Sequence, residues 1–284
     1  NDCTLRAAMM EANVSDDASE ITFDNVTEIT PLTSLPDLTA ANTTINGEGL
    51  VTINGNQISE KYRSGFKIQD ASYNVIQGLT IKNFWYGISI ISNNASAMYN
   101  VIGLTPGNSS YTSKRNIIVQ NTIGIALSGI NTSENIITGN HIGINTDGTT
   151  PWPNQGAGIF ISSDAHDNTI GSTSGSGVDQ GGNLISGNSG PGIHISNGYQ
   201  NHLTGNYIGT DSSGANPVPN FVGLRINNSS KNNIIGIAPS GEGSFNLVSG
   251  NLNDGIHIMD LDSSTNLIAG NLIGTTFDGS SSLG

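Results

Sequence analysis

The stretch NLVSGNLNDGIHI, from Asn246 to Ile258, contains two of the three short motifs that this chain repeats. A first run of the form NxIxG precedes it, as in NIIG from Asn233, and the stretch itself supplies a second such run and then GIxI. Runs resembling GIxI begin at Gly65, Gly87, Gly124, Gly158, Gly192, Gly223 and Gly255. Because a unit this short cannot bury its own apolar residues, each copy has to stack on the next one.

The spacing of these runs defines a coil. The interval is 22 residues from Gly65 to Gly87 and 31 to 37 residues thereafter, so a minimal coil of three runs exists and later coils carry insertions. Alternating apolar residues within a run indicate a strand, and Gly or Asn at its ends allows a tight bend. Such strands pair in parallel with the equivalent strand one coil later. The repeat therefore predicts an all-β fold, a single-stranded right-handed parallel β-helix with three short strands per coil and about seven or eight coils.

The N-terminal residues differ from the repeat. CTLRAAMMEAN, from residue 3 to residue 13, has apolar residues spaced as on one face of a short helix, at Leu5, Ala8, Met9 and Ala12. A helix in this place would cover the strand edges and core side chains at the end of a solenoid. We expect residues 1–20 to form a helical cap and residues 21–284 to form the β-helix. We also expect Cys3, the single cysteine, to be a small buried residue.

The last residues, NLIAGNLIGTTFDGSSSLG, supply two runs and stop in the loop before a further GIxI would be expected. An open parallel edge pairs readily with other strands. We therefore expect the column to continue beyond residue 284 or to be capped by another chain. Self-association is a further expectation, either end to end through this edge or laterally through the apolar outward positions described below.

Several segments resemble one family. CTLRAAMMEAN resembles the CSLREAI-type N-terminal motif of secreted bacterial β-helix proteins, although Ala7 replaces the usual acidic residue and Met9 stands where the motif has Ile. ITFDNVTEITPLTSLPDLTAANTTINGEG, which begins at residue 21, is similar to the segment that leads those proteins into their first coil, and GNYIGTDSSG, PVPN and NLISGN are similar to their repeats. The resemblance covers essentially the whole chain. It implies a right-handed parallel β-helix of the pectate-lyase-like superfamily and a secreted or surface-attached location, usually without an assigned reaction.

Two sets of repeat positions predict packing. The leading Asn of each first run is expected to stack into a ladder of side-chain amides, at Asn74, Asn100, Asn135, Asn168, Asn201, Asn233 and Asn266. The outward positions of the first two runs are too apolar for open water, at Val75, Val101, Ile136, Ile234 and Leu267 in one sheet and at Ile117, Leu184, Tyr207, Leu247 and Leu272 in the other. Either the inserted loops fold back over them, with Trp152 as one cover residue, or they form a lateral interface with another chain.

Composition excludes some partners. Charged residues make up 11% of the chain, against about 25% in typical domains. The formal net charge is -13 with nine Lys and Arg, and no basic run occurs, which argues against nucleic acid or an anionic membrane as a partner. No apolar stretch is long enough for membrane insertion.

Catalytic and metal-binding patterns are weak. A hydrolase needs two or three carboxylates that converge across a groove, and the carboxylates of this repeat do not cluster, so no catalytic residue is predicted. A lyase would want calcium held by several carboxylates together with a basic residue, and no metal cluster is evident, so no cofactor is predicted. Weak calcium binding remains open for acidic residues in loops that alternate sides of the column, at Asp147, Asp179, Asp211 and Asp278. The alternative is that these residues form Asx turns.

One column of outward residues gathers several basic side chains of the repeat. The x position of GIxI is occupied in turn by Lys67, Ser89, Ala126, Phe160, His194, Arg225 and His257. Neighbours in this column should lie about 4.8 Å apart. We predict that Phe160, His194, Arg225 and His257 bind an acidic glycan or an acidic partner surface; an ordinary solvated face is the alternative.

These observations favour a structural or adhesive β-helix of the cell surface, secreted or surface-attached, over an enzyme. Self-assembly into a filament or matrix is part of this expectation. The alternative is a polysaccharide-binding module, or a polysaccharide lyase or glycoside hydrolase, that acts on an acidic glycan.

Overall fold

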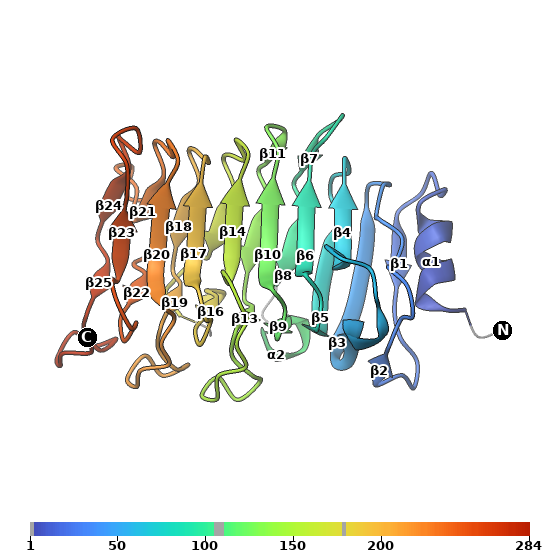
Figure 1. The fold of residues 1–284 in the computed structure, drawn as a ribbon, viewed down its shortest axis with the longest axis horizontal. Helices are drawn as coiled ribbons and strands as arrows, with labels where there is room; N and C mark the ends of the chain where they lie inside the picture. The colour runs from blue at the N-terminus through green and yellow to red at the C-terminus, as the bar shows by residue number, and fades with distance from the viewer. Residues whose placement is uncertain (1–2, 105–110, 178–179) are drawn as a thin grey trace.

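The chain folds as a right-handed parallel β-helix (Figure 1). The computed structural model describes residues 3–104, 111–177 and 180–284. The strands lie side by side along one column, with α1 (Leu5–Ala12) across its N-terminal end and the C-terminus at the opposite end. Every ladder between the described strands is parallel, as the predicted fold requires.

The GIxI runs form the third stack, a seven-stranded sheet on the side of the column that faces the viewer in Figure 1. Its strands are β4 (Ser64–Gln69), β6 (Tyr86–Ile91), β10 (Ile123–Ser128), β14 (Ile159–Ser162), β17 (Pro191–Ser196), β20 (Val222–Asn227) and β23 (Ile256–Ile258).

The NxIxG runs form two further stacks, which meet in the long strand β5 (Val75–Lys82). That coil has no insertion, so its first run continues directly into its second. The first stack continues with β8 (Val101–Gly103), β12 (Ile136–Thr138), β15 (Thr169–Gly171), β18 (His202–Thr204), β21 (Ile234–Gly236) and β24 (Leu267–Ala269). The second stack continues with β9 (Ile117–Val119), β13 (His141–Ile142), β16 (Leu184–Ile185), β19 (Tyr207–Ile208), β22 (Leu247–Val248) and β25 (Leu272–Ile273).

The remaining elements lie at the N-terminal end and in the connections. β1 (Ser19–Ile21) and β2 (Glu28–Ile29) pair with the long β3 (Thr43–Asn54), which in turn pairs with β5. A 3-10 turn, η1 (Gly55–Gln57), follows β3, while β7 (Ala97–Met98) and β11 (Thr132–Ser133) pair at one corner and α2 (Tyr111–Lys114) precedes β9.

The N-terminal helix covers the core as predicted. Leu5, Met9 and Ala12 are buried among the core residues of the column, and the Thr4 side chain accepts a hydrogen bond from the Ala7 backbone N–H at 3.2 Å. Thr4 therefore caps the helix start. The expectation for Cys3 is wrong, because this residue is exposed. It lies before the helix begins, outside the apolar face that the helix presents to the core.

Inward isoleucines and corner glycines fill the interior. Ile88, Ile125, Ile159, Ile193 and Leu224 are fully buried in successive coils. The glycine that opens a GIxI run lies, from Gly65 to Gly223, at a corner where no side chain fits: a Cβ at Gly158 would lie 2.7 Å from the Gly192 carbonyl oxygen and 3.0 Å from Cγ2 of Ile185. The repeated glycine is therefore required by the close approach of successive coils.

Three asparagine ladders follow the corners, where one had been predicted. The predicted ladder is confirmed from Asn100 to Asn266, with amide-to-amide distances of 2.9 to 3.1 Å. Asn74 joins it through its backbone N–H, which donates to Asn100 Oδ1 at 2.9 Å. A second ladder follows the start of the second runs, at Asn116, Asn140, Asn183, Asn206, Asn246 and Asn271. A third precedes the GIxI runs, at Asn121, Asn154, Asn188, Asn220 and Asn251.

The inserted loops fold over the second stack. Leu184, Tyr207 and Leu247 form an apolar cluster with Ile144 and Val218, which lie in the insertions after β13 and β19. The predicted loop cover is confirmed for this stack. Trp152, in the first of these insertions, remains 41% exposed.

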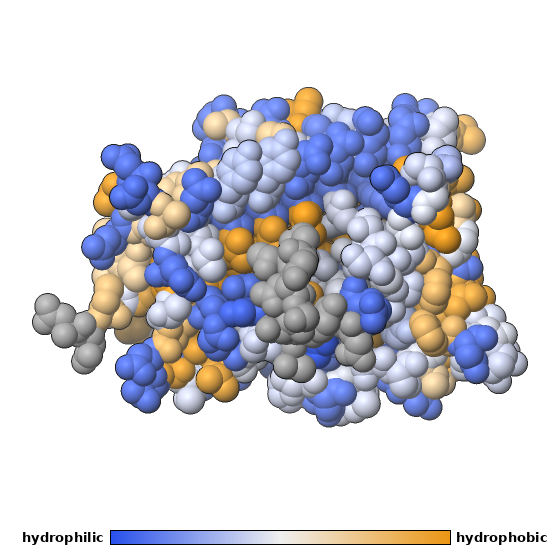
Figure 2. All heavy atoms as spheres, turned by 180° about the vertical axis from the view of Figure 1, so that it is seen from behind, coloured by the Kyte–Doolittle hydropathy of each residue, from blue (hydrophilic) through white to orange (hydrophobic). Residues whose placement is uncertain are grey.

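The outward apolar residues of the first stack are only half-buried, as the burial of Val75, Val101 and Ile136 shows. Figure 2, which views the column from behind, shows hydrophobic residues gathered near its middle with hydrophilic residues along the upper edge.

Candidate functional site

The predicted column of outward residues exists in the third stack. Phe160 pairs in register with His194, His194 with Arg225, and Arg225 with His257. These four half-buried side chains, named the Arg225 strip here, come from β14, β17, β20 and β23. The rings of Phe160 and His194 are in contact, with centroids 5.1 Å apart and a tilt of 50°. The structure therefore brings all four predicted residues together.

The positive charge of the column is more concentrated than the sequence indicated. Lys67 Nζ forms an ion pair with Asp37 Oδ2 at 2.9 Å, and His257 Nδ1 lies 2.8 Å from Asp254 Oδ2. Burial lowers the pKa of His194, and the neighbouring Arg225 guanidinium lowers it further, against the hydrogen bond with Asn227 at 2.9 Å. His194 is therefore a neutral hydrogen-bonding ring near pH 7.

Arg225 carries the remaining charge. Its Nε is buried and has no hydrogen-bond partner within the part of the chain that the structure describes, and none of the ion pairs found there includes its guanidinium. A guanidinium presents five donors in a planar fork that matches a carboxylate or a sulfate. The strip thus places one guanidinium between two imidazoles, with a phenyl ring beyond.

A row of polar side chains flanks the strip. Ser162, Ser196 and Asn227 are in register, two residues along the same strands from Phe160, His194 and Arg225. Hydroxyl and amide groups at this spacing can hydrogen-bond the hydroxyls of a sugar chain. The outer face of the third stack therefore combines apolar, cationic and neutral polar groups.

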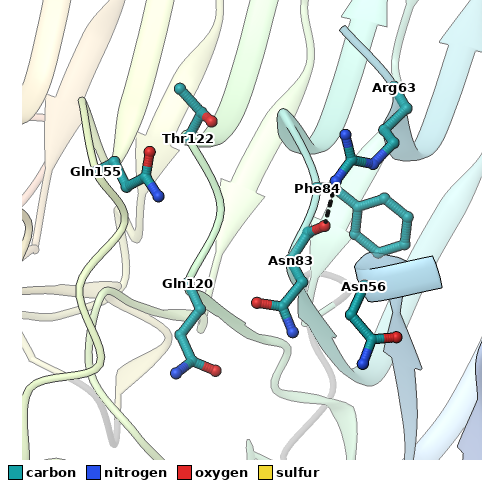
Figure 3. A pocket seen from close by; sticks show the side chains of 7 residues that line it. All are labelled: Asn56, Arg63, Asn83, Phe84, Gln120, Thr122 and Gln155. Atoms are coloured by element: carbon teal, nitrogen blue, oxygen red, sulfur yellow. Dashed lines mark hydrogen bonds between the residues drawn. The ribbon is translucent and has the colours of Figure 1, made fainter. Parts of the chain in front are cut away.

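A second concave feature lies at the corner where the third-stack strands begin. This pocket has a volume of about 290 Å³ and is lined almost entirely by polar side chains, namely Asn56, Arg63, Asn83, Phe84, Gln120, Thr122 and Gln155. Figure 3 shows Asn83, Gln120 and Gln155 projecting from successive coils, with the Arg63 guanidinium donating to the Asn83 carbonyl oxygen at 3.2 Å.

Two aromatic residues, the exposed Tyr62 and the half-buried Trp85, adjoin the pocket residues Arg63 and Phe84 in the sequence. Tyr62 and Trp85 meet edge to face, with centroids 4.7 Å apart, and the Trp85 backbone N–H donates to the Arg63 carbonyl at 3.0 Å. The sequence pattern does not predict this site. Its residues occupy corner positions that differ from coil to coil, so the repeat marks them only as turns; the run of amides just before each GIxI was the one available signal.

The acidic loops do not form a calcium site within the described residues. Asp147 Oδ1 accepts hydrogen bonds from the Thr149 and Thr150 backbones, and bonds from Thr149 and Asn145 hold the pKa of Asp147 far below its usual range. Asp211 and Asp278 are bonded in the same way within their own loops, and hydrogen bonds from Thr276 and Ser280 lower the pKa of Asp278 to about 2. These carboxylates serve as turn acceptors, the alternative given above. Asp179 lies outside the described residues.

No three His, Cys, Asp or Glu side chains gather into a potential metal site in the described ranges. The polar groups of the strip and of the pocket include no pair of carboxylates in either place. The arrangement can therefore hold a polar or anionic chain. No helix in the described part of the chain is long and apolar enough to cross a bilayer.

Comparison with known proteins gives structural neighbours only. No protein-family model and no curated protein sequence matches this chain. Among solved structures, an alginate lyase from Paenibacillus sp. str. FPU-7 is 16% identical with a TM-score of 0.48, over 94% of this chain and 95% of the lyase. A mutant of the periplasmic alginate epimerase AlgG is 14% identical with a TM-score of 0.46, over 81% of this chain and 50% of the epimerase. The A-module of the Azotobacter vinelandii mannuronan C-5 epimerase AlgE4 is 12% identical with a TM-score of 0.30, over 95% and 92%. The chain spans about half the length of AlgG.

Proposed function

We propose that this protein binds an acidic polysaccharide on the outer face of the third stack. The observation that carries the proposal is Arg225, a half-buried guanidinium without an ion-pair partner among the described residues, set between His194 and His257. A buried donor left without a partner is costly, so a site that supplies one to a ligand gains affinity.

The surroundings of Arg225 suit a uronic acid chain better than a small inorganic anion. Phe160 offers an apolar surface on which a sugar ring can pack, and the row of Ser162, Ser196 and Asn227 offers groups for its hydroxyls. A carboxylate of the sugar would pair with the guanidinium fork. The net charge of -13 disfavours unspecific attraction of polyanions, so binding depends on this local arrangement.

The secreted or surface-attached location expected from the CSLREAI-type motif belongs to the same proposal, because acidic polysaccharides of this kind are extracellular materials. A structural or adhesive role without a bound glycan, the first expectation from the sequence, is the competing function.

Titration with polygalacturonate tests the proposal. Arg225→Gln keeps the side chain polar and removes its charge, and it should weaken binding at least about tenfold. Lys231→Gln, an exposed lysine at the following corner, makes the same change in net charge and should leave binding within about twofold. Equal affinities of wild type and Arg225→Gln would overturn the proposed site.

A further inference from the structure

We infer that the corner pocket is a second glycan-binding site, in which an extended sugar chain lies along the column axis with one carboxylate on Arg63. The site consists of Arg63, Trp85 and the corner row, defined as Asn56, Asn83, Gln120 and Gln155. The ligand class rests on the proposed function, while the site itself rests on separate residues and separate contacts.

The first observation is that the corner row has unused hydrogen-bonding groups. The side chains of Asn56, Gln120 and Gln155 make no hydrogen bond to any of the described residues, whereas the ladder amides one residue away, Asn121 and Asn154, are fully engaged. The ladder amides therefore make the hydrogen bonds that hold this corner together. The row beside it is free to bind something else.

The second observation is the spacing of the row. Its members come from successive coils, which lie about 4.8 Å apart, and the backbones of Asn83 and Gln120 are joined by a hydrogen bond of 3.2 Å. This repeat is close to the length of one sugar in an extended glycan. Each amide has both a donor and an acceptor, so a chain parallel to the axis can meet one amide per sugar.

The third observation is the pairing of a cation with an aromatic ring at one end of the row. Arg63 donates to the carbonyl oxygens of Glu60 and Asn83, at 2.9 and 3.2 Å, which fixes its guanidinium at the pocket. Its Nε is left without a partner among the described residues. The Trp85 ring, edge to face with Tyr62, provides an apolar surface beside it. These are the elements of a site for a uronate.

The pocket and the Arg225 strip border the same sheet at different coils. The corner row ends at Gln155, just before β14, and the strip begins at Phe160 within β14. One long polymer can therefore contact both sites, and the second contact gains from the first through effective concentration. A short oligosaccharide can occupy only one.

The test uses Trp85 as a reporter. Trp152→Phe leaves Trp85 as the single tryptophan, and a short oligogalacturonate should then change its fluorescence in a saturable manner. Adding Gln155→Glu, which keeps the shape of the side chain and adds a negative charge inside the pocket, should weaken this response about five- to tenfold. Gln200→Glu adds the same charge at an exposed corner away from the pocket and should change the affinity less than twofold.

The outcomes separate this inference from the proposed function. Binding of polygalacturonate that depends on Arg225 without any Trp85 response to the oligosaccharide would overturn the second site and leave the first. A Trp85 response that is weakened by Gln155→Glu and unchanged by Arg225→Gln would support the second site even if the first failed. The absence of binding to both sugars, or equal effects of Gln155→Glu and Gln200→Glu, would overturn the inference.

Discussion

Replacing His141 with leucine should remove a large part of the acid sensitivity of the fold. His141 lies in an outward position of the second stack, in register with Ile117 and Leu184, and is only 1% exposed because the insertion after β13 covers it. Its Nδ1 lies 2.9 Å from the Asn145 carbonyl oxygen, and its Nε2 has no partner among the described residues. Burial, together with the charge of Arg115 and against that of Asp147, lowers the pKa of His141 from 6.5 to about 3.

The sign of the effect follows from proton uptake. Below pH 6.5 the unfolded chain binds a proton at His141 and the folded chain does not, so the free energy of unfolding falls as the pH falls from 6.5 toward 3. Each pH unit in this window costs about 1.4 kcal/mol, or about 3 kcal/mol at pH 4.5. Above pH 6.5 this contribution is constant, since His141 is neutral in both states.

Urea denaturation of wild type and His141→Leu at several pH values measures this difference. Leucine occupies the same position in the next coil, so the variant should fold, with a change of about 1 kcal/mol at pH 7.5 from the lost hydrogen bond. Its free energy of unfolding should then fall by about 3 kcal/mol less than that of wild type on moving to pH 4.5. The carboxylates titrate in the same way in both proteins, so their contribution cancels in this comparison. If the free energies of unfolding of the two proteins fell by the same amount from pH 7.5 to 4.5, the burial of the imidazole would not oppose its protonation.

Two further predictions concern the packing of the column. Asn183→Ala should lower the free energy of unfolding, measured by urea denaturation, by about 2 to 4 kcal/mol. The substitution removes the hydrogen-bond partner of the buried Ile137 carbonyl and of two neighbouring ladder amides, at 2.8 to 3.0 Å. A loss below about 1 kcal/mol would mean that the ladder is not stabilising. Leu184→Ala, in the cluster under the inserted loops, should also lower the free energy of unfolding by about 2 to 4 kcal/mol. The control Leu252→Ala changes an exposed leucine and should lower it by less than about 0.5 kcal/mol. Equal losses for the two variants would show that the loops do not bury this stack.

Most of the fold could be predicted from the repeat because its constraints are local and periodic. Gly158 and its equivalents mark corners where successive coils approach too closely for a side chain, and the flanking isoleucines mark strands. The first asparagine ladder was recognised from Asn100 and its equivalents. The other two ladders were not recognised, because Asn183 and Asn188 flank one short run and resemble ordinary turn residues in the sequence. Only the fold shows that each is hydrogen-bonded to its equivalent in the next coil.

The candidate sites were only partly predictable. The Arg225 strip follows from register alone, because every residue at the x position of GIxI faces outward. The charge of the column could not be predicted from register, because the carboxylates that pair with Lys67 and His257 lie in a distant loop and at the preceding corner. The pocket at Arg63 escaped prediction because it is assembled from corners of different coils, none of which has a distinctive sequence by itself. Cys3 was misplaced because the buried face of the helix begins only at Leu5.

The claim that the third stack binds an acidic glycan is tested most directly by titrating the wild-type protein with polygalacturonate and with a neutral dextran of similar size. At 0.15 M salt, charges farther apart than about 8 Å are screened, so the net charge of -13 has little effect and contact with Arg225 dominates. We expect saturable binding of polygalacturonate that weakens as salt is raised to 1 M, with little or no binding of dextran. Equal binding of the two polymers, or no binding of polygalacturonate at 0.15 M salt, would contradict it.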